Sequence, residues 1–111
     1  MLHLRFRAVD TEVMSALSIA LVAELQQLFP TSSLEDFTFE LVSTQFYKQG
    51  DIYHGSPFVE VLYANVTPVV QDKLAEVITH NVQLAAGQDI DVTVIFTEFH
   101  PGVCYLNGKK H

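Results

Sequence analysis

The first residues of the chain alternate between apolar and polar side chains, which predicts a strand with one buried face. Successive side chains of a strand point to opposite faces of a sheet, so the apolar set should face a core. The apolar set is Leu2, Leu4, Phe6 and Ala8, and the polar set is His3, Arg5 and Arg7. Asp10 then ends the predicted strand, where its short acceptor side chain suits the N-cap of a helix.

An amphipathic helix is predicted next, over about residues 11 to 29, followed by a second alternating strand over residues 37–44. Glu12 suits the positive end of the helix dipole, and Pro30 stops the helix. Apolar residues recur at spacings of three and four, so that one stripe of this helix should lie on the sheet. These residues are Met14, Leu17, Leu21, Leu25 and Leu28.

The same order recurs in the second half of the chain, with strands predicted over residues 58–63 and 91–97. Between them, Thr67 and Pro68 supply an N-cap hydroxyl and a proline suited to the first helical position. Gly87 is placed to take the left-handed conformation just past the end of this helix, which should span about residues 67 to 86. The apolar stripe is Val70, Leu74, Val77, Ile78 and Val82.

Two βαβ repeats therefore predict an α/β (α+β) fold, with a four-stranded mixed sheet and two helices on one of its faces. The repeats span about residues 2–46 and 58–99 of a single domain, residues 1–111. The order βαββαβ alone would also fit ferredoxin-like modules. In those modules the strands of each half are split apart.

Composition agrees with one core, because 49% of the 111 residues are hydrophobic. No apolar stretch approaches the roughly 20 residues that a membrane span needs, and no signal-peptide pattern is present. Cys104 is the only cysteine, so an internal disulfide is excluded and a small, partly buried hydrophobe is expected there. We expect a soluble cytoplasmic protein.

Charge and motif content exclude several classes of function. Thirteen acidic against six basic residues give a net charge of −7 at pH 7, which argues against nucleic acid or an anionic membrane surface as partner. The five histidines lack metal-ligand spacing, and neither HExxH nor CxxC occurs. The sequence predicts neither a metal site nor another cofactor.

The polar face of the first strand carries the only two arginines, Arg5 and Arg7. Other strands place polar and apolar residues where they could share that face, namely Glu40, Glu60, Thr93, Thr97, Val42, Leu62 and Ile95. Such a face is too apolar for a purely solvated surface and too polar for a core. It could face water, with modest cross-strand ion pairs. We favour a subunit interface in which Arg5 and Arg7 meet Glu40 and Glu60.

Besides the paired βαβ halves, three segments of the chain stand out: Met1-Leu2-His3-Leu4-Arg5-Phe6, the loop around Gly50 and Gly55-Ser56-Pro57, and Phe99-His100-Pro101-Gly102. With these features the whole chain resembles the tautomerase superfamily, which has the fold of macrophage migration inhibitory factor and 5-carboxymethyl-2-hydroxymuconate isomerase. It is most similar to a bacterial family of uncharacterised role within that superfamily. The resemblance implies that each βαβ half keeps its two strands adjacent and parallel, and that three subunits form a homotrimer with their sheets packed around an axis. It also implies proton transfer next to a carbonyl, with an N-terminal proline as general base.

The sequence departs from that pattern at the decisive position, because Leu2 stands where the proline should be. The candidates for proton transfer are then Met1, through a primary amine, and Leu2 by position alone. The loop over residues 32–36 carries acids where the better-known members have a basic residue that binds an acidic substrate. Thr93 stands where a tyrosine often lines the pocket.

Two hypotheses follow from different classes of function. We favour a homotrimeric binding or structural protein that has the fold but has lost the chemistry. Its partners would be further copies of the same chain and at most a small-molecule ligand. The alternative is an isomerase of a small carbonyl acid that uses a base other than proline. Such an isomerase would retain the superfamily pocket around Met1 and Leu2, walled by Ser33, Asn65, Val66, Thr93 and Ile95. Tyr47, Tyr53 and His54 are expected to pack on a neighbouring subunit rather than to form a pocket rim.

Overall fold

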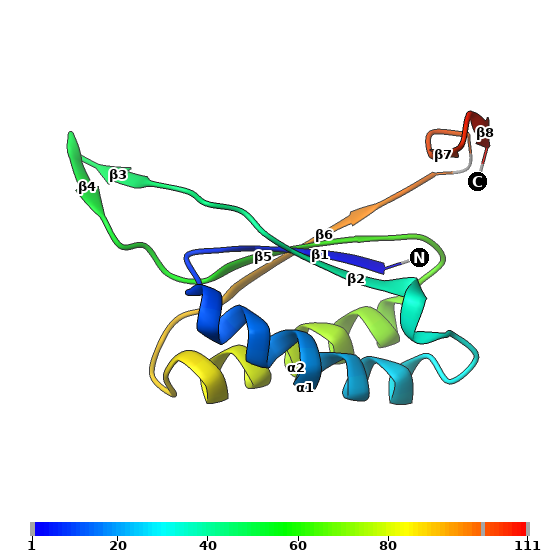
Figure 1. Ribbon diagram of the computed structural model, residues 1–111, viewed down its shortest axis with the longest axis horizontal. Helices are drawn as coiled ribbons and strands as arrows, with labels where there is room; N and C mark the ends of the chain where they lie inside the picture. The colour runs from blue at the N-terminus through cyan, green and yellow to red at the C-terminus, as the bar shows by residue number, and fades with distance from the viewer. Residues whose placement is uncertain (1, 101, 111) are drawn as a thin grey trace.

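The computed structural model describes residues 2–100 and 102–110. Two helices lie side by side against one face of a four-stranded sheet, and two hairpins project from it (Figure 1). The sheet contains β1 (Leu2–Arg7), β2 (Phe37–Leu41), β5 (Phe58–Tyr63) and β6 (Thr93–Glu98). The helices are α1 (Thr11–Leu28) and α2 (Pro68–Ala86), with a single turn of 3-10 helix, η1 (Leu34–Asp36), before β2.

Each βαβ half keeps its two strands adjacent and parallel, as predicted. The strand order is β2-β1-β5-β6, with β1 parallel to β2, β5 parallel to β6, and β1 antiparallel to β5. A ferredoxin-like order would separate the strands of each half, so the tautomerase-like arrangement is confirmed and the ferredoxin-like one is excluded.

The core lies between the sheet and the helices, where the apolar stripes predicted from the sequence meet. Leu4 and Phe6 of β1 are fully buried, as are Leu21 of α1 and Leu74 of α2. Burying a side chain of this size contributes about 1.5–3 kcal/mol. Both repeats therefore share one hydrophobic cluster. None of the helices in the described residues is long and apolar enough to cross a bilayer.

The helix ends follow the predicted positions with two corrections, at Gly87 and Asp10. Thr67 caps α2, because its Oγ1 accepts a hydrogen bond from the backbone N–H of Val70 at 3.3 Å. Gly87 takes a positive φ of 148°, outside the left-handed helical values that were expected. Asp10 occupies the N-cap of α1, but its side chain makes no capping hydrogen bond. The first turn of α1 is closed by the backbone bond from Met14 N–H to the Asp10 carbonyl, 2.9 Å long.

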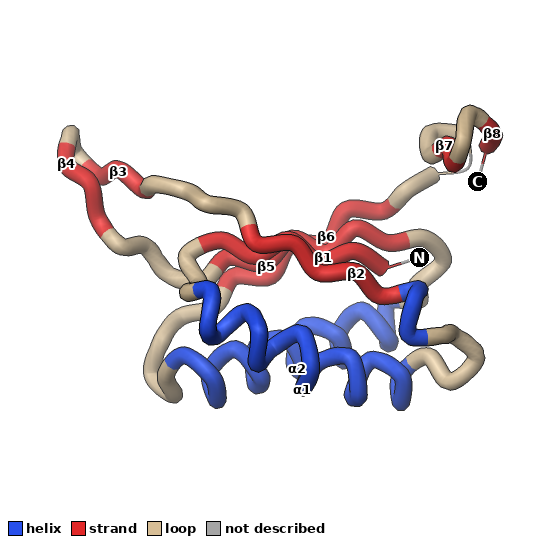
Figure 2. Tube along the Cα trace, viewed as in Figure 1, coloured by secondary structure: helices blue, strands red, loops and turns tan. Residues whose placement is uncertain are grey.

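Two short hairpins extend the chain beyond the sheet, in regions where no strand was predicted from the sequence. They are β3 (Phe46–Lys48) with β4 (Asp51–Tyr53), and β7 (Tyr105–Leu106) with β8 (Lys109–Lys110). We call them the first and second arms. Figure 2 shows both arms reaching away from the helix layer. Accordingly β2 ends at Leu41 instead of residue 44, and β6 runs from Thr93 to Glu98 instead of over residues 91–97.

The first arm is stabilised by contacts within itself. The rings of Phe46 and Tyr53 meet edge to face with centroids 5.9 Å apart, and the Lys48 Nζ lies 6.0 Å from the centre of the Tyr53 ring. A Cβ on Gly55 would lie 2.7 Å from the Phe46 ring, so only glycine fits there. Tyr47 and Ile52 are each 61% exposed. An isolated two-stranded hairpin is marginally stable in water, so this arm would gain from a partner surface.

Candidate functional site

A cavity of about 160 Å³ opens at the N-terminal end of β1. We call it the N-terminal pocket. The start of β1, η1 and the turn between β5 and α2 all lie at this end of the molecule (Figure 1). Its lining consists of Leu2, Phe29, Ser32, Asp36, Phe37, Ala64, Asn65 and Val66.

Strand register brings the apolar wall of this pocket together. Leu2 pairs with Phe37 of β2 on one side and with Tyr63 of β5 on the other. Leu2 is only 3% exposed and Phe37 only 7% exposed, so their side chains belong to both the core and the pocket wall. Phe29, just past the end of α1, packs on Phe37 with ring centroids 6.1 Å apart. The pocket is thus a recess with two phenylalanines in its wall, lined also by the buried Leu2.

One carboxylate lies at the polar side of the pocket. Asp36 closes a capping box on η1, in which its Oδ2 accepts from the Ser33 backbone N–H at 2.9 Å and from the Ser33 Oγ at 3.5 Å. Asn65 reaches the pocket from a turn in which its φ is 61°. Among the described residues, no lysine, arginine or histidine lines the pocket.

The structure brings together only part of the pocket proposed from the sequence. Asn65 and Val66 line it, and Ser32 lines it in place of its neighbour Ser33. Met1 lies outside the described residues. Thr93 and Ile95 sit on the exposed face of β6, across the sheet from the helices, and do not line this pocket within one subunit. These two could join it only from a neighbouring copy.

Phe29, Asp36 and Phe37 line the pocket but were not predicted from the sequence to do so. A signal for Asp36 was available, because Ser33 and Asp36 have the spacing of a capping box, which predicts a helical turn at this place. For the two phenylalanines the sequence offered only apolar character, which core residues share.

The sheet face away from the helices carries a row of ion pairs centred on Arg5. Arg5 is paired in register with Glu40 of β2 and Glu60 of β5. The Arg5 Nε lies 2.9 Å from the Glu40 Oε1, and the Arg5 Nη1 lies 3.4 Å from the Glu60 Oε1. The His3 Nε2 is 2.7 Å from the same Glu40 oxygen. The predicted partners of Arg5 therefore meet it within one subunit, whereas Arg7 makes no ion pair with any described residue.

Hydrogen bonds from His3 and then Arg5 to the Glu40 carboxylate hold its pKa below the ordinary value of 4.5. A carboxylate with a lowered pKa in the folded state stabilises the fold above its unfolded pKa, and that contribution is lost as pH falls through the folded value. We expect wild type to lose more stability than Glu40→Gln between pH 6 and pH 3 in urea unfolding. The control is Glu76→Gln, which changes an exposed acid of α2 that makes no ion pair with a described residue. Parallel pH profiles for wild type and Glu40→Gln would contradict this prediction.

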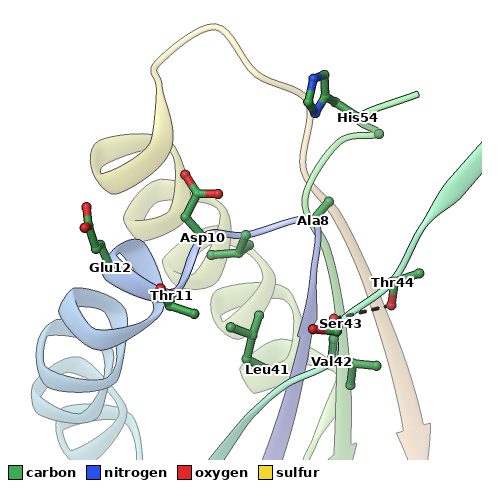
Figure 3. Close-up of a pocket in the computed structure, with 11 residues that line it drawn as sticks. Ala8, Asp10, Thr11, Glu12, Leu41, Val42, Ser43, Thr44 and His54 are labelled. Carbon is green, nitrogen blue, oxygen red and sulfur yellow. Dashed lines mark hydrogen bonds between the residues drawn. The ribbon is translucent and has the colours of Figure 1, made fainter. Parts of the chain in front are cut away.

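A larger cavity, about 650 Å³, lies at the opposite end of β1 (Figure 3). Asp10 and Glu12 line it beside the N-terminus of α1, and His54 lines it from the base of the first arm, on the other side of the cavity. The two acids suit the positive end of the helix dipole. No group of three or more metal-ligating side chains is found in the part of the chain that the structure describes. The N-terminal pocket is the better candidate site because buried apolar side chains, those of Leu2 and Phe37, line it, as is usual for small-molecule sites.

Solved structures with the same fold include two from bacteria and one from an amoeba. A domain of unknown function (DUF1904) from Sebaldella termitidis is 28% identical, with a TM-score of 0.89 over 100% of both chains. A protein of unknown function from Vibrio cholerae is 35% identical, with a TM-score of 0.86 over 99% of this chain and 87% of that one. A macrophage migration inhibitory factor-like protein from Entamoeba histolytica is 12% identical, with a TM-score of 0.74 over 99% of this chain and 98% of that one.

The third similarity shows the fold alone, and it confirms the tautomerase-like architecture predicted from the sequence. No protein with a curated description is detectably similar in sequence. The family model described as domain of unknown function (DUF1904) matches residues 1–110, nearly the whole chain. This chain therefore belongs to the DUF1904 family, and it has the fold of a macrophage migration inhibitory factor-like protein.

Proposed function

We propose that this protein is a homotrimeric binding protein that keeps the tautomerase-like fold without proline-based keto–enol chemistry. The observation that carries the proposal is the position of Leu2, a buried residue that lines the N-terminal pocket. A general base must present a proton-accepting atom to the substrate. The Leu2 side chain has none, and the Leu2 backbone nitrogen is a peptide amide bonded to Met1, whose lone pair is delocalised.

The other polar groups of the pocket also argue against the chemistry that the resemblance implies. The only ionisable side chain among its described lining residues is Asp36, whose carboxylate is engaged in the capping box. Phenylpyruvate and related acids carry a carboxylate of their own, which Asp36 would repel. A binding role for a molecule without that charge is the simpler use of this pocket.

Self-association is supported by the exposed sheet face and by the arms. Ile95 is 44% exposed on the outer face of the edge strand β6, beside Glu60 of the row of ion pairs centred on Arg5. Strands β2 and β6 form the two edges of the sheet, and sheet edges readily pair with further strands. Three copies arranged as the resemblance implies would cover the outer faces and give the arms a surface on which to pack.

The activity prediction is tested with an ultraviolet assay of phenylpyruvate and hydroxyphenylpyruvate tautomerisation. We expect rates indistinguishable from the buffer-catalysed reaction, because the pocket lacks a placed base and repels the substrate carboxylate. Robust turnover that scales with enzyme concentration would contradict the proposal and favour an isomerase with another base.

The assembly prediction is tested by size-exclusion chromatography with light scattering. We expect the mass of three subunits at micromolar protein concentration. A monomer under these conditions would remove the trimer from the proposal and return the outer face to solvent.

A further inference from the structure

We infer that the N-terminal pocket selects small organic cations, namely amines with a compact apolar body, over carboxylates of the same shape. This inference rests on the proposed binding role and names the chemical class of the ligand. It combines the size of the cavity, the aromatic pair in its wall and the carboxylate of Asp36.

The size of the cavity limits the apolar body of the ligand. A volume of about 160 Å³ is close to that of an apolar protein cavity of about 150 Å³ that binds benzene. Leu2 and Val66 offer aliphatic surface to such a group, and Phe29 and Phe37 offer aromatic surface. One phenyl ring with a short substituent would fill this pocket.

The negative charge of Asp36 in the pocket wall determines which charge the polar substituent of the ligand should carry. Asp36 uses Oδ2 for both of its hydrogen bonds to Ser33, which leaves Oδ1 to accept a further hydrogen bond. An ammonium group there would form a charge-assisted hydrogen bond, and aromatic rings attract cations through their faces. Phe29 and Phe37 supply two such rings in the same wall. A carboxylate at the same place would meet Asp36 with no cationic side chain among the described lining residues to balance it.

The experiment compares benzylamine, benzyl alcohol and benzoate, three probes of nearly equal shape and different charge. Titrations are followed in ¹H–¹⁵N correlation spectra of the assembled protein, at low salt and neutral pH, through the amides of Phe29, Phe37 and Asn65. We expect benzylamine to bind about tenfold more tightly than benzoate, with benzyl alcohol between them, since Asp36 is exposed and its field is weakened by water. High salt should narrow the difference.

Two variants test the role of Asp36. Asp36→Asn removes the charge but keeps an oxygen that can accept from the Ser33 N–H, so η1 should stay folded. Glu35→Gln removes the same charge from the neighbouring residue of η1, which does not line the pocket. We expect the preference for benzylamine over benzoate to disappear in Asp36→Asn and to persist in Glu35→Gln.

Each other outcome overturns a defined part of the argument. If benzoate binds as tightly as benzylamine, or if the preference survives in Asp36→Asn, the selection for cations is wrong and the binding role stands. If none of the three probes shifts the pocket amides of the folded protein, the binding role fails as well.

Discussion

Arg5→Glu should convert the proposed homotrimer into smaller species and lower the melting temperature. Arg5 lies between Glu40 and Glu60 on adjacent strands, so the substitution would place three carboxylates side by side. Like charges directly opposite each other on neighbouring strands destabilise a sheet. If three such faces also meet in the assembly, the repulsion is repeated in every subunit. Light scattering and circular dichroism together measure the mass and the folding of the variant.

Two further variants separate the loss of assembly from the loss of folding. Arg5→Gln removes the cation without adding a third acid, so it should stay folded and shift the monomer–trimer equilibrium less than Arg5→Glu. Lys73→Glu makes the same charge reversal on the exposed side of α2 and should leave both mass and melting temperature nearly unchanged. A trimer of Arg5→Glu with the stability of wild type would show that the outer face is not an interface.

The sheet and the helices could be predicted because both halves of the chain show the same sequence of hydrophobic periodicities. Alternation in β1 and β5 and the three-to-four spacing in α1 and α2 each have one physical cause, the burial of one face. Leu4 and Leu74 are fully buried as that pattern requires. The parallel order within each half followed from the resemblance, because periodicity alone also fits the ferredoxin-like order.

The arms could not be predicted from periodicity, because strands of two or three residues are too short to show a pattern. Their signal lies in the turns. Asn107 and Gly108 both have positive φ, of 53° and 79°, and Gln49 and Gly50 have φ of 51° and 87°. An Asn-Gly pair between two strands is the strongest local sign of a two-residue hairpin. The pair Asn107-Gly108 is such a signal for the second arm, whereas Gln49-Gly50 is a weaker signal for the first arm.

The pocket predicted from the sequence combined residues from both faces of the sheet. Leu2 points to the helix side, whereas Ile95 lies beside Glu60 on the outer side, so one subunit cannot bring the two into the same cavity. The alternation of side chains between the two faces of a strand was sufficient to assign Leu2 and Ile95 to opposite faces of the sheet. This alternation gives no information about η1, whose single turn places Asp36 at the pocket.

Leu2→Ala should both destabilise the protein and open the N-terminal pocket. Leu2 is 3% exposed, and truncating a buried leucine to alanine costs about 2–5 kcal/mol, with a larger cost where the cavity cannot collapse. Urea unfolding at one fixed protein concentration measures the loss. The control is Leu106→Ala on the second arm, where the side chain is 59% exposed and the expected change is within about 0.5 kcal/mol.

The space vacated by Leu2 adjoins the aromatic wall, so an uncharged probe should bind the variant more tightly than wild type. Saturating benzyl alcohol should then restore part of the lost stability, because a ligand that binds only the folded state raises the free energy of unfolding with its concentration. The midpoint of urea unfolding should rise with benzyl alcohol in Leu2→Ala and less in wild type. Equal rises in both proteins would mean that the Leu2 side chain does not limit the space available to a ligand in the N-terminal pocket.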